Sequence, residues 1–276
     1  MNRILLASLA LSGITVGLLA QGRQAATTTQ GSETGIQQIS VGGTPRISPA
    51  DGAKPAPRLP DGRIDLTGPW VAGGSNADIE RDGGLKPGEL PLLPWARQLR
   101  DSRKTENEPY TACLPMSVPR VNPYPWKFAM TYTSRGLTHI YVLHETGDAG
   151  AHRVIYMDGR THPADPLPTW WGHSIGRFEK DTLIVDTVGY NDKFWFDSRG
   201  TPHTEQLHTI ERWTRINFGT MVNEFTLDDP GAFSRPVQLT FTAAHIRPDL
   251  DLMEFICLED NQYGQAAGFT PAQPDK

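Results

Sequence analysis

The chain has 276 residues and a formal net charge of −5, from 26 Lys and Arg against 31 Asp and Glu. This acidic balance, without any cluster of basic residues, argues against nucleic acid as a partner.

The N-terminus has the pattern of a secretory signal peptide. Asn2 and Arg3 precede the apolar run Ile4 to Leu19, and Ala20-Gln21-Gly22 supplies the small residues that a signal peptidase requires. The pattern predicts a signal peptide over residues 1–22 and a periplasmic or secreted protein. No other apolar run is long enough to cross a bilayer, so we expect no membrane span.

The segment after the signal peptide is polar and has few large apolar residues. Residues 23–58 contain Thr-Thr-Thr, scattered Gly, Ser and Gln, and the run PADGAKPAP. Such a segment cannot bury enough surface to become ordered, which predicts a disordered linker. We expect a single β-barrel-like domain over residues 59–262 and a loose tail over 263–276.

The two cysteines, Cys113 and Cys257, are the only ones in the chain. Because an exported chain meets an oxidising compartment, we expect a disulfide between them; two buried free thiols are the alternative. By the chain-entropy model, closing so long a loop contributes about 4–5 kcal/mol.

The first part of the expected domain is predicted to contain one strand, near Leu66 to Trp70, and one helix. The run RLPDGRIDLTGPW ends in a Gly-x-Trp at the expected first strand, as in lipocalin-type barrels. A helix is expected near Pro94 to Lys104, because Pro94 suits a first turn and Leu93, Ala96 and Leu99 form a helical stripe. The following CLPMSVPRVNPYPW contains four prolines and predicts an irregular, extended segment.

From Lys127 onward, short alternating runs separated by turn residues predict strands. The expected strands are Phe128–Thr133, His139–Glu145, Val154–Met157, His173–Glu179, Thr182–Val188, Thr209–Ile216, Thr220–Leu227, Val237–Ala244 and Leu252–Leu258. Even spacing without intervening helices predicts an all-β fold, an antiparallel meander closed as a calycin/lipocalin-like barrel with one peripheral helix. An open sandwich is the alternative.

A hairpin at His173 to Val188 organises the rest of the prediction. A two-residue turn at Lys180-Asp181 sets the register, so that His173 faces Val188 and Ile175 faces Asp186. Because side chains alternate, His173, Arg177 and Asp186 share one face of the sheet. We expect Arg177 on an inner face as the partner of Glu211.

Several long motifs resemble a large family of secreted bacterial β-rich proteins of unsettled function. The motifs are RLPDGRIDLTGPW, CLPMSVPRVNPYPWKF, PTWWGHSIGRFEKDTLIVDTVGYND, PHTEQLHTIERW and LDDPGAFSRPV, and the likeness extends from Arg58 to Asn261. The resemblance implies an exported β-rich domain.

Metal ligation is the first chemistry that the polar residues suggest. His173, His203 and His208, with Asp186, are candidate ligands for zinc, iron or manganese, and we expect them to converge at one end of the barrel. Histidines at 203 and 208 that merely cap a loop and a strand are the alternative. Further candidate catalytic residues are Asp186 itself, Asn191, Asp192 and Glu205.

The aromatics around these residues suggest a binding wall. Candidate substrate contacts are Trp170, Trp171, Arg177, Tyr190, Trp195 and Glu211. The expectation is a secreted enzyme that cleaves a small, partly aromatic molecule in a barrel cavity, as a hydrolase or lyase, by metal-assisted or His/Asp acid–base chemistry. The alternative is a non-catalytic carrier of an apolar small ligand.

Nucleophile elbow, P-loop and Rossmann motifs are absent from the sequence, so no nucleotide cofactor is expected. The histidines at 139, 144, 152, 162 and 245 are interpreted as structural or solvated.

Overall fold

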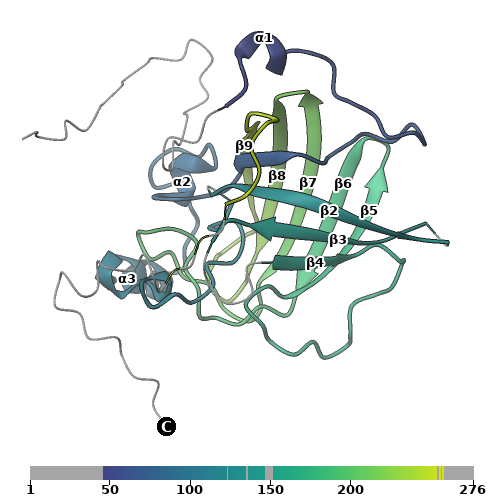
Figure 1. Ribbon diagram of the computed structural model, residues 1–276. Helices are drawn as coiled ribbons and strands as arrows, with labels where there is room; N and C mark the ends of the chain where they lie inside the picture. Colours follow the sequence, from purple (N-terminus) through teal and green to yellow (C-terminus); the bar gives the residue numbers. More distant parts are fainter. Residues whose placement is uncertain are drawn as a thin grey trace, which may run out of the picture. The chain divides into compact units, whose positions relative to one another are not determined.

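Nine strands form one closed barrel in the computed structural model, which describes residues 46–122, 124–134, 136–146, 152–253, 255 and 257. The strands are β1 (Pro69–Ala72), β2 (Trp126–Thr133), β3 (Gly136–His144), β4 (His152–Tyr156), β5 (His173–Glu179), β6 (Thr182–Val188), β7 (His208–Asn217), β8 (Thr220–Asp228) and β9 (Val237–His245). Each strand pairs with the next one, and β9 pairs with β1 to close the sheet (Figure 1). The predicted all-β barrel is confirmed.

One strand pair departs from the predicted antiparallel meander. β4 and β5 run parallel, with Ile155 opposite Ser174 and Tyr156 opposite Ile175, whereas the other pairs are antiparallel. A parallel pair cannot be joined by a tight hairpin and needs a crossover of a dozen or more residues. Residues 157–172, with prolines at 163, 166 and 168, provide that crossover.

The hairpin β5–β6 has the predicted register, with His173 opposite Val188 and Ile175 opposite Asp186. Lys180 takes a φ of 55° in its two-residue turn, the left-handed conformation that such hairpins require. The buried face of this hairpin carries Ser174, Leu183, Val185 and Thr187. The face with His173 and Asp186 is therefore the outer face of the barrel.

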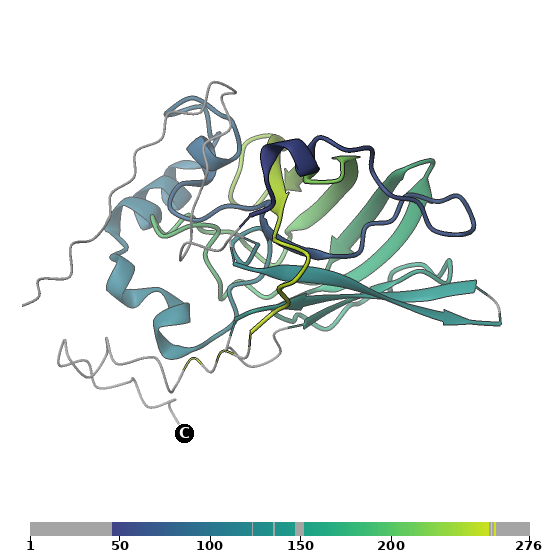
Figure 2. The same ribbon diagram turned by 45° about the horizontal axis from the view of Figure 1, so that its top comes forward.

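α2 (Ile79–Asp82) and α3 (Pro94–Ser102) lie at one end of the barrel, whereas α1 (Pro49–Gly52) lies against the β7–β8 turn, where the N–H of Gly219 donates to the carbonyl of Gly52. α3 begins at the proline predicted to start it and ends just before the predicted boundary. The one-turn helices α1 and α2, and two 3₁₀ turns, η1 (Thr105–Asn107) and η2 (Pro109–Ala112), were not predicted. Figures 1 and 2 show α2 and α3 beside the same barrel end.

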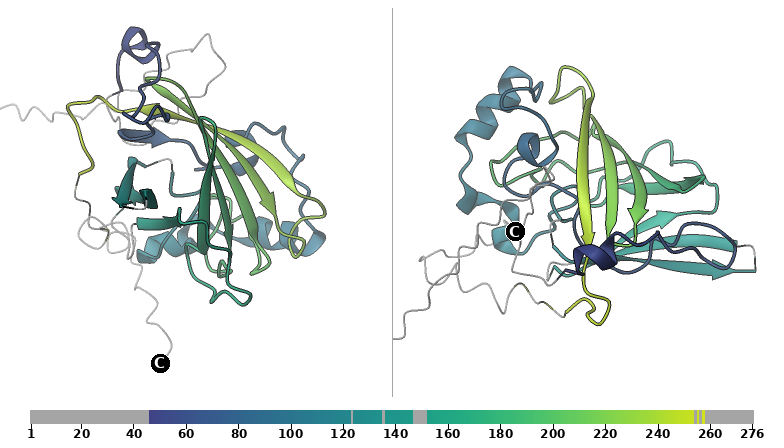
Figure 3. Two further views of the ribbon diagram at one scale, coloured as in Figure 1. Left: turned by 90° about the vertical axis from the view of Figure 1, so that its right-hand side faces the viewer. Right: turned by 90° about the horizontal axis from the view of Figure 1, so that it is seen from above.

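The apolar core divides into two clusters. One, which we call the barrel cluster, lies inside the sheet around Trp70, Trp126 and Trp213. The other, the end cluster, joins Ile79 of α2 and Ala96 of α3 to Phe225, Phe241 and neighbouring residues. The two further views in Figure 3 show the loops and helices gathered at that end of the strands.

Two connections outside the barrel bear on the predicted boundaries. Cys113 and Cys257 form the predicted disulfide across 144 residues of chain. Residues 46–58, predicted as linker, lie against the barrel: the N–H of Phe218 donates to the carbonyl of Lys54 at 2.8 Å, and Arg58 pairs with Asp181 at 2.6 Å. The predicted signal peptide, the rest of the predicted linker and the predicted tail lie outside the described residues.

The last predicted strand, Leu252–Leu258, is wrong for its described residues, 252, 253, 255 and 257, which are not in strands. The reason is that β9 already pairs with β8 on one edge and β1 on the other, so the closed sheet offers no edge to another strand.

Candidate functional site

Three histidines and one aspartate meet on the outer face of β5, β6 and β7. His173 begins β5, Asp186 lies near the end of β6, and His208 begins β7. Antiparallel pairing of β6 with β7 places Asp186 opposite Ile210, two residues along the same face from His208. His162 comes from the crossover between β4 and β5 and completes the group.

Asp186 is the centre of the hydrogen bonding. Its Oδ1 lies 2.8 Å from Nε2 of His208 and 3.1 Å from Nε2 of His162. The second ring nitrogen of His162, Nδ1, lies 2.9 Å from Nδ1 of His173. We call these four residues the outer His/Asp cluster. The three predicted residues His173, Asp186 and His208 therefore do share a site, with His162 as the bridge to His173.

The acceptor character of the carboxylate fixes the tautomers of the neutral rings. An ionised carboxylate only accepts, so Nε2 of His208 and Nε2 of His162 each carry the proton that they donate. Nδ1 of His162 is then an acceptor and receives the Nδ1–H of His173. This assignment leaves Nδ1 of His208 unprotonated, and no described residue hydrogen-bonds to it.

The neighbours of His173 favour its neutral form. Burial lowers the pKa of His173 below the ordinary histidine value, and the nearby His162 and Arg160 lower it further. The Tyr156 ring stacks on His173 at 5.1 Å between centroids, and the Arg160 guanidinium lies 3.8 Å from the centre of the Tyr156 ring. His139 contacts Tyr156 from β3, so rings line the face beside the cluster.

His162 was not predicted from the sequence as a site residue and was interpreted as structural or solvated. It lies among prolines and small residues, where no periodicity indicates which way a side chain faces. Only the parallel pairing of β4 with β5 brings this crossover over the outer face, and nothing in the sequence predicted that pairing.

His203 does not join the cluster. The centroid of its ring lies 3.9 Å from the ring centroid of Phe194 and 4.9 Å from that of Phe196. Its Nδ1–H donates to the carbonyl of Thr204 at 3.3 Å. Burial lowers the pKa of His203 to about 4. The predicted convergence of His203 with His173 and His208 is therefore wrong, because the loop before β7 packs the His203 ring against Phe194 and Phe196.

The other predicted catalytic residues lie away from Asp186. Asn191 is buried, and its Oδ1 accepts from the N–H of Lys193 at 3.1 Å, which is a local turn contact. Asp192 and Glu205 are exposed. Within the described residues, no hydrogen bond or ion pair connects these three side chains to the outer His/Asp cluster.

The predicted Arg177–Glu211 pair does not form. Arg177 is on the outer face and pairs with Glu179 at 2.8 Å. Glu211 points into the barrel, where its Oε2 lies 2.5 Å from Nη1 of Arg153 on β4. The prediction failed because it assigned Arg177 to the wrong face; alternation places Ser174 and Gly176, not Arg177, inside.

The aromatic residues predicted to contact a substrate do not form one continuous surface. Tyr190 is buried, with its hydroxyl 2.8 Å from that of Thr209, and Trp195 is buried beneath the Arg103 guanidinium. Trp171 stacks on His144 at 5.3 Å. Trp170 and Trp171 are partly buried against the end cluster. These residues contribute to the barrel end rather than to the outer His/Asp cluster.

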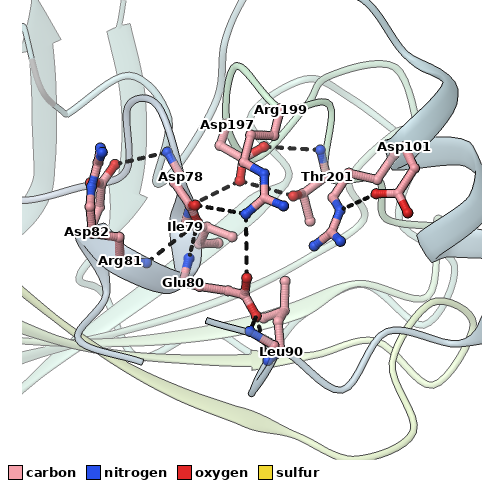
Figure 4. A network of polar contacts seen from close by, with 12 residues as sticks. Asp78, Ile79, Glu80, Arg81, Asp82, Leu90, Asp101, Asp197, Arg199 and Thr201 are labelled. Carbon is pink, nitrogen blue, oxygen red and sulfur yellow. Dashed lines mark hydrogen bonds and ion pairs between the residues drawn. The ribbon is translucent and has the colours of Figure 1, made fainter. Parts of the chain in front are cut away.

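A polar network holds the loop after β6 against α2 (Figure 4). Asp197 accepts from the N–H groups of Ile79 at 2.9 Å and Thr201 at 3.0 Å. Arg199 bridges from the same loop to Asp78 at 2.7 Å and to Glu80 at 3.4 Å. Burial raises the pKa of Asp197. Since these groups have partners, the network fixes the loop in place.

The described residues form a closed β-barrel with a hydrogen-bonded group of three histidines and one aspartate on its outer face. No family model, curated protein or solved structure matches the chain. Among the described residues, no helix is both long and apolar enough to cross a membrane, and no group of three or more His, Cys, Asp or Glu side chains is placed to hold a metal ion.

Proposed function

We propose that the protein is a secreted enzyme, a hydrolase or lyase, that cleaves a small, partly aromatic molecule by acid–base catalysis at the outer His/Asp cluster. The observation that carries the proposal is the double use of Asp186: one carboxylate oxygen holds two imidazoles, and a third imidazole extends the chain through His162. An aspartate behind a histidine orients the ring and stabilises the imidazolium that forms when it takes a proton.

His208 is the proposed general base. Asp186 accepts from its Nε2–H, which leaves Nδ1 to remove a proton from water or from substrate. The side chain of His208 is 37% exposed, so a substrate can reach it, whereas that of Asp186 is less exposed, at 26%. The proton that Nδ1 of His208 takes up is then available for the leaving group, while His173 and His162 form a second arm of hydrogen bonds on the same carboxylate.

The neighbouring rings support an aromatic substrate. Tyr156 and His139 lie on the same outer face as His173, and Tyr141 stacks on His139 at 6.0 Å. All are partly exposed, so a planar molecule can contact them while it reaches the cluster.

Acid–base chemistry is proposed ahead of metal-assisted cleavage because His162 uses both ring nitrogens in hydrogen bonds within the cluster. Zinc, iron or manganese at His173 and His208 remains a prediction. The carrier alternative is less well supported, since the barrel interior contains an ion pair and polar side chains, which do not suit an apolar ligand.

The experiment is an assay of two substrate panels, aromatic esters for hydrolysis and aromatic β-hydroxy acids for elimination, with wild-type protein and three variants. Asp186→Asn and His208→Gln should each lower kcat/KM by about 10²–10⁴-fold for any substrate that is turned over. His152→Gln, at an exposed histidine on β4 that belongs neither to the cluster nor to the neighbouring rings, is the matched control and should retain kcat/KM. Turnover that persists unchanged in both cluster variants, or no turnover of any panel member, would contradict the proposal.

A further inference from the structure

A cavity of about 520 Å³ lies at the turn between β7 and β8. Three separate parts of the chain line it: the segment 46–54 that contains α1, Phe218 of the turn, and residues 247–249 after β9. The volume falls within the range of roughly 300–1,000 Å³ that is usual for small-molecule sites. None of the four residues of the outer His/Asp cluster is among the described residues that line this cavity, so it is a separate feature of the molecule.

Backbone hydrogen bonds hold the walls of the cavity together. The N–H of Phe218 donates to the carbonyl of Lys54 at 2.8 Å, which fixes the β7–β8 turn to the segment around α1. The N–H of Ile47 donates to the carbonyl of His245 at 3.4 Å, which fixes the start of the same segment to the end of β9. Because the bonds join all three parts of the lining, the cavity is formed before any ligand enters it.

One part of the lining is apolar. Ile47, Phe218 and Pro248 contribute its carbon surface. The Phe218 ring stacks on the ring of His245 with 5.1 Å between centroids, and the Arg215 guanidinium lies 5.2 Å from the centre of the Phe218 ring. Since these contacts hold the ring in place, the cavity has a fixed apolar wall against which a ligand can exclude water.

The rest of the lining is charged, and three cations stand against two carboxylates among the described residues that line the cavity. Lys54 pairs with Asp51 at 2.6 Å, and Arg247 pairs with Asp249 at 2.5 Å, so each carboxylate is matched by a cation. Arg46 is the third cation, and burial lowers its pKa, although a guanidinium stays protonated at neutral pH. The lining therefore carries one positive charge in excess.

This combination is complementary to an organic anion with an apolar body. A single negative charge balances the excess positive charge of the lining, and guanidinium groups such as Arg46 and Arg247 suit a carboxylate because they can donate two parallel N–H···O bonds. An aromatic body can pack against the wall that contains Phe218. A polyanion would bring its further charges towards Asp51 and Asp249, where like charges repel.

We propose that the cavity at the β7–β8 turn is a binding site for a small aromatic monocarboxylate. The charged lining recognises the carboxylate, and the apolar wall of Ile47, Phe218 and Pro248 contacts the ring. The proposal does not depend on the enzymatic function proposed for the outer His/Asp cluster.

The test is an NMR titration of the full chain with benzoate, and with benzamide as an uncharged analogue of the same shape, at constant ionic strength. The backbone amide signals of Ile47 and Phe218 should shift in a saturable way with benzoate, with a Kd of about 1 mM. Benzamide should bind about tenfold more weakly, because it lacks the charge that strengthens the hydrogen bonds.

Two variants should change the affinity for benzoate in opposite directions. Arg46→Gln removes one cation and should raise Kd about tenfold. Asp249→Asn removes the carboxylate beside Arg247 and should lower Kd about two- to fivefold. The amide spectrum away from the cavity should stay unchanged in both variants, which verifies that they fold.

Two further variants serve as controls. Arg235→Gln, at an exposed arginine outside the cavity lining, should bind benzoate like wild type, which separates a local effect from a change in net charge. Asp186→Asn should also leave Kd unchanged, and loss of binding in that variant would place benzoate at the outer His/Asp cluster and overturn the proposal. No saturable shift up to roughly 50 mM benzoate, equal affinity for benzamide, or an unchanged Kd in both Arg46→Gln and Asp249→Asn would overturn it as well.

Discussion

At the scale of single residues, the histidines of this barrel differ in what surrounds them. Those of the outer His/Asp cluster hydrogen-bond to a carboxylate or to each other, whereas His203 is enclosed by Phe194 and Phe196. Enclosure by apolar rings disfavours the charged imidazolium, so protonation of His203 must destabilise the folded protein.

The pH dependence of stability follows from His203. Its pKa falls from about 6.5 in the unfolded chain to about 4 in the folded one. As the pH falls, the unfolded state therefore binds the proton before the folded state does. The contribution of neutral His203 to the free energy of unfolding is fully present above about pH 6.5 and is lost as the pH falls from there to about 4. By pH 4 the loss from this group amounts to about 3 kcal/mol.

Urea unfolding of wild-type protein and His203→Phe at several pH values measures this effect. The variant should lose less stability between about pH 6.5 and 4 than wild type does, because its side chain cannot take up a proton. His152→Gln, at an exposed histidine, is the control and should follow the wild-type curve. Parallel curves for His203→Phe and wild type would contradict the assigned cause.

The sequence predicted part of the site at this scale. His173 and Asp186 share a face because strand alternation and a two-residue turn leave only one register, and the structure has that register. Alternation alone does not say which face is buried, and this ambiguity placed Arg177 inside and left Arg153 unnoticed as the partner of Glu211. His162 could not be predicted, since its segment has no period to assign its side chain to a face.

At the scale of elements, the loop after β6 and α2 stabilise each other through Asp197. Its carboxylate satisfies the N–H groups of Ile79 and Thr201, which are otherwise orphaned at a helix start and a loop. Four residues cannot sustain a helix alone, so α2 depends on this contact and on the burial of Ile79.

Asp197→Ala should therefore destabilise the protein by about 2–4 kcal/mol, because it leaves two buried donors without acceptors. Asp192→Ala, in the same loop but exposed, should change stability by less than about 0.5 kcal/mol. Denaturant unfolding with amide hydrogen exchange at Ile79 and Thr201 checks both values. Equal stability of the two variants, or protection of the Ile79 amide retained in Asp197→Ala, would refute the role given to this network.

At the scale of the whole molecule, the barrel was predictable because short alternating runs and turn residues persist from Trp126 to His245, and closure removes exposed edges. The disulfide followed from an even cysteine count behind a predicted signal peptide. The parallel β4–β5 pair was not predictable, because strand periodicity carries no information on direction. That one pair places the crossover, and with it His162, over the outer face.

The central claim is that Asp186 holds His208 and His162 in the tautomer that leaves Nδ1 of His208 as a base. Long-range ¹H–¹⁵N NMR of the histidine rings tests it most directly, at about pH 8, above the ordinary histidine pKa of about 6.5. The account predicts protonated Nε2 and unprotonated Nδ1 for His208 and His162, and protonated Nδ1 for His173. Asp186→Asn should disturb all three rings and leave His139 unchanged. A protonated Nδ1 on His208 in the wild-type protein would contradict the account, because that nitrogen could not then accept a proton.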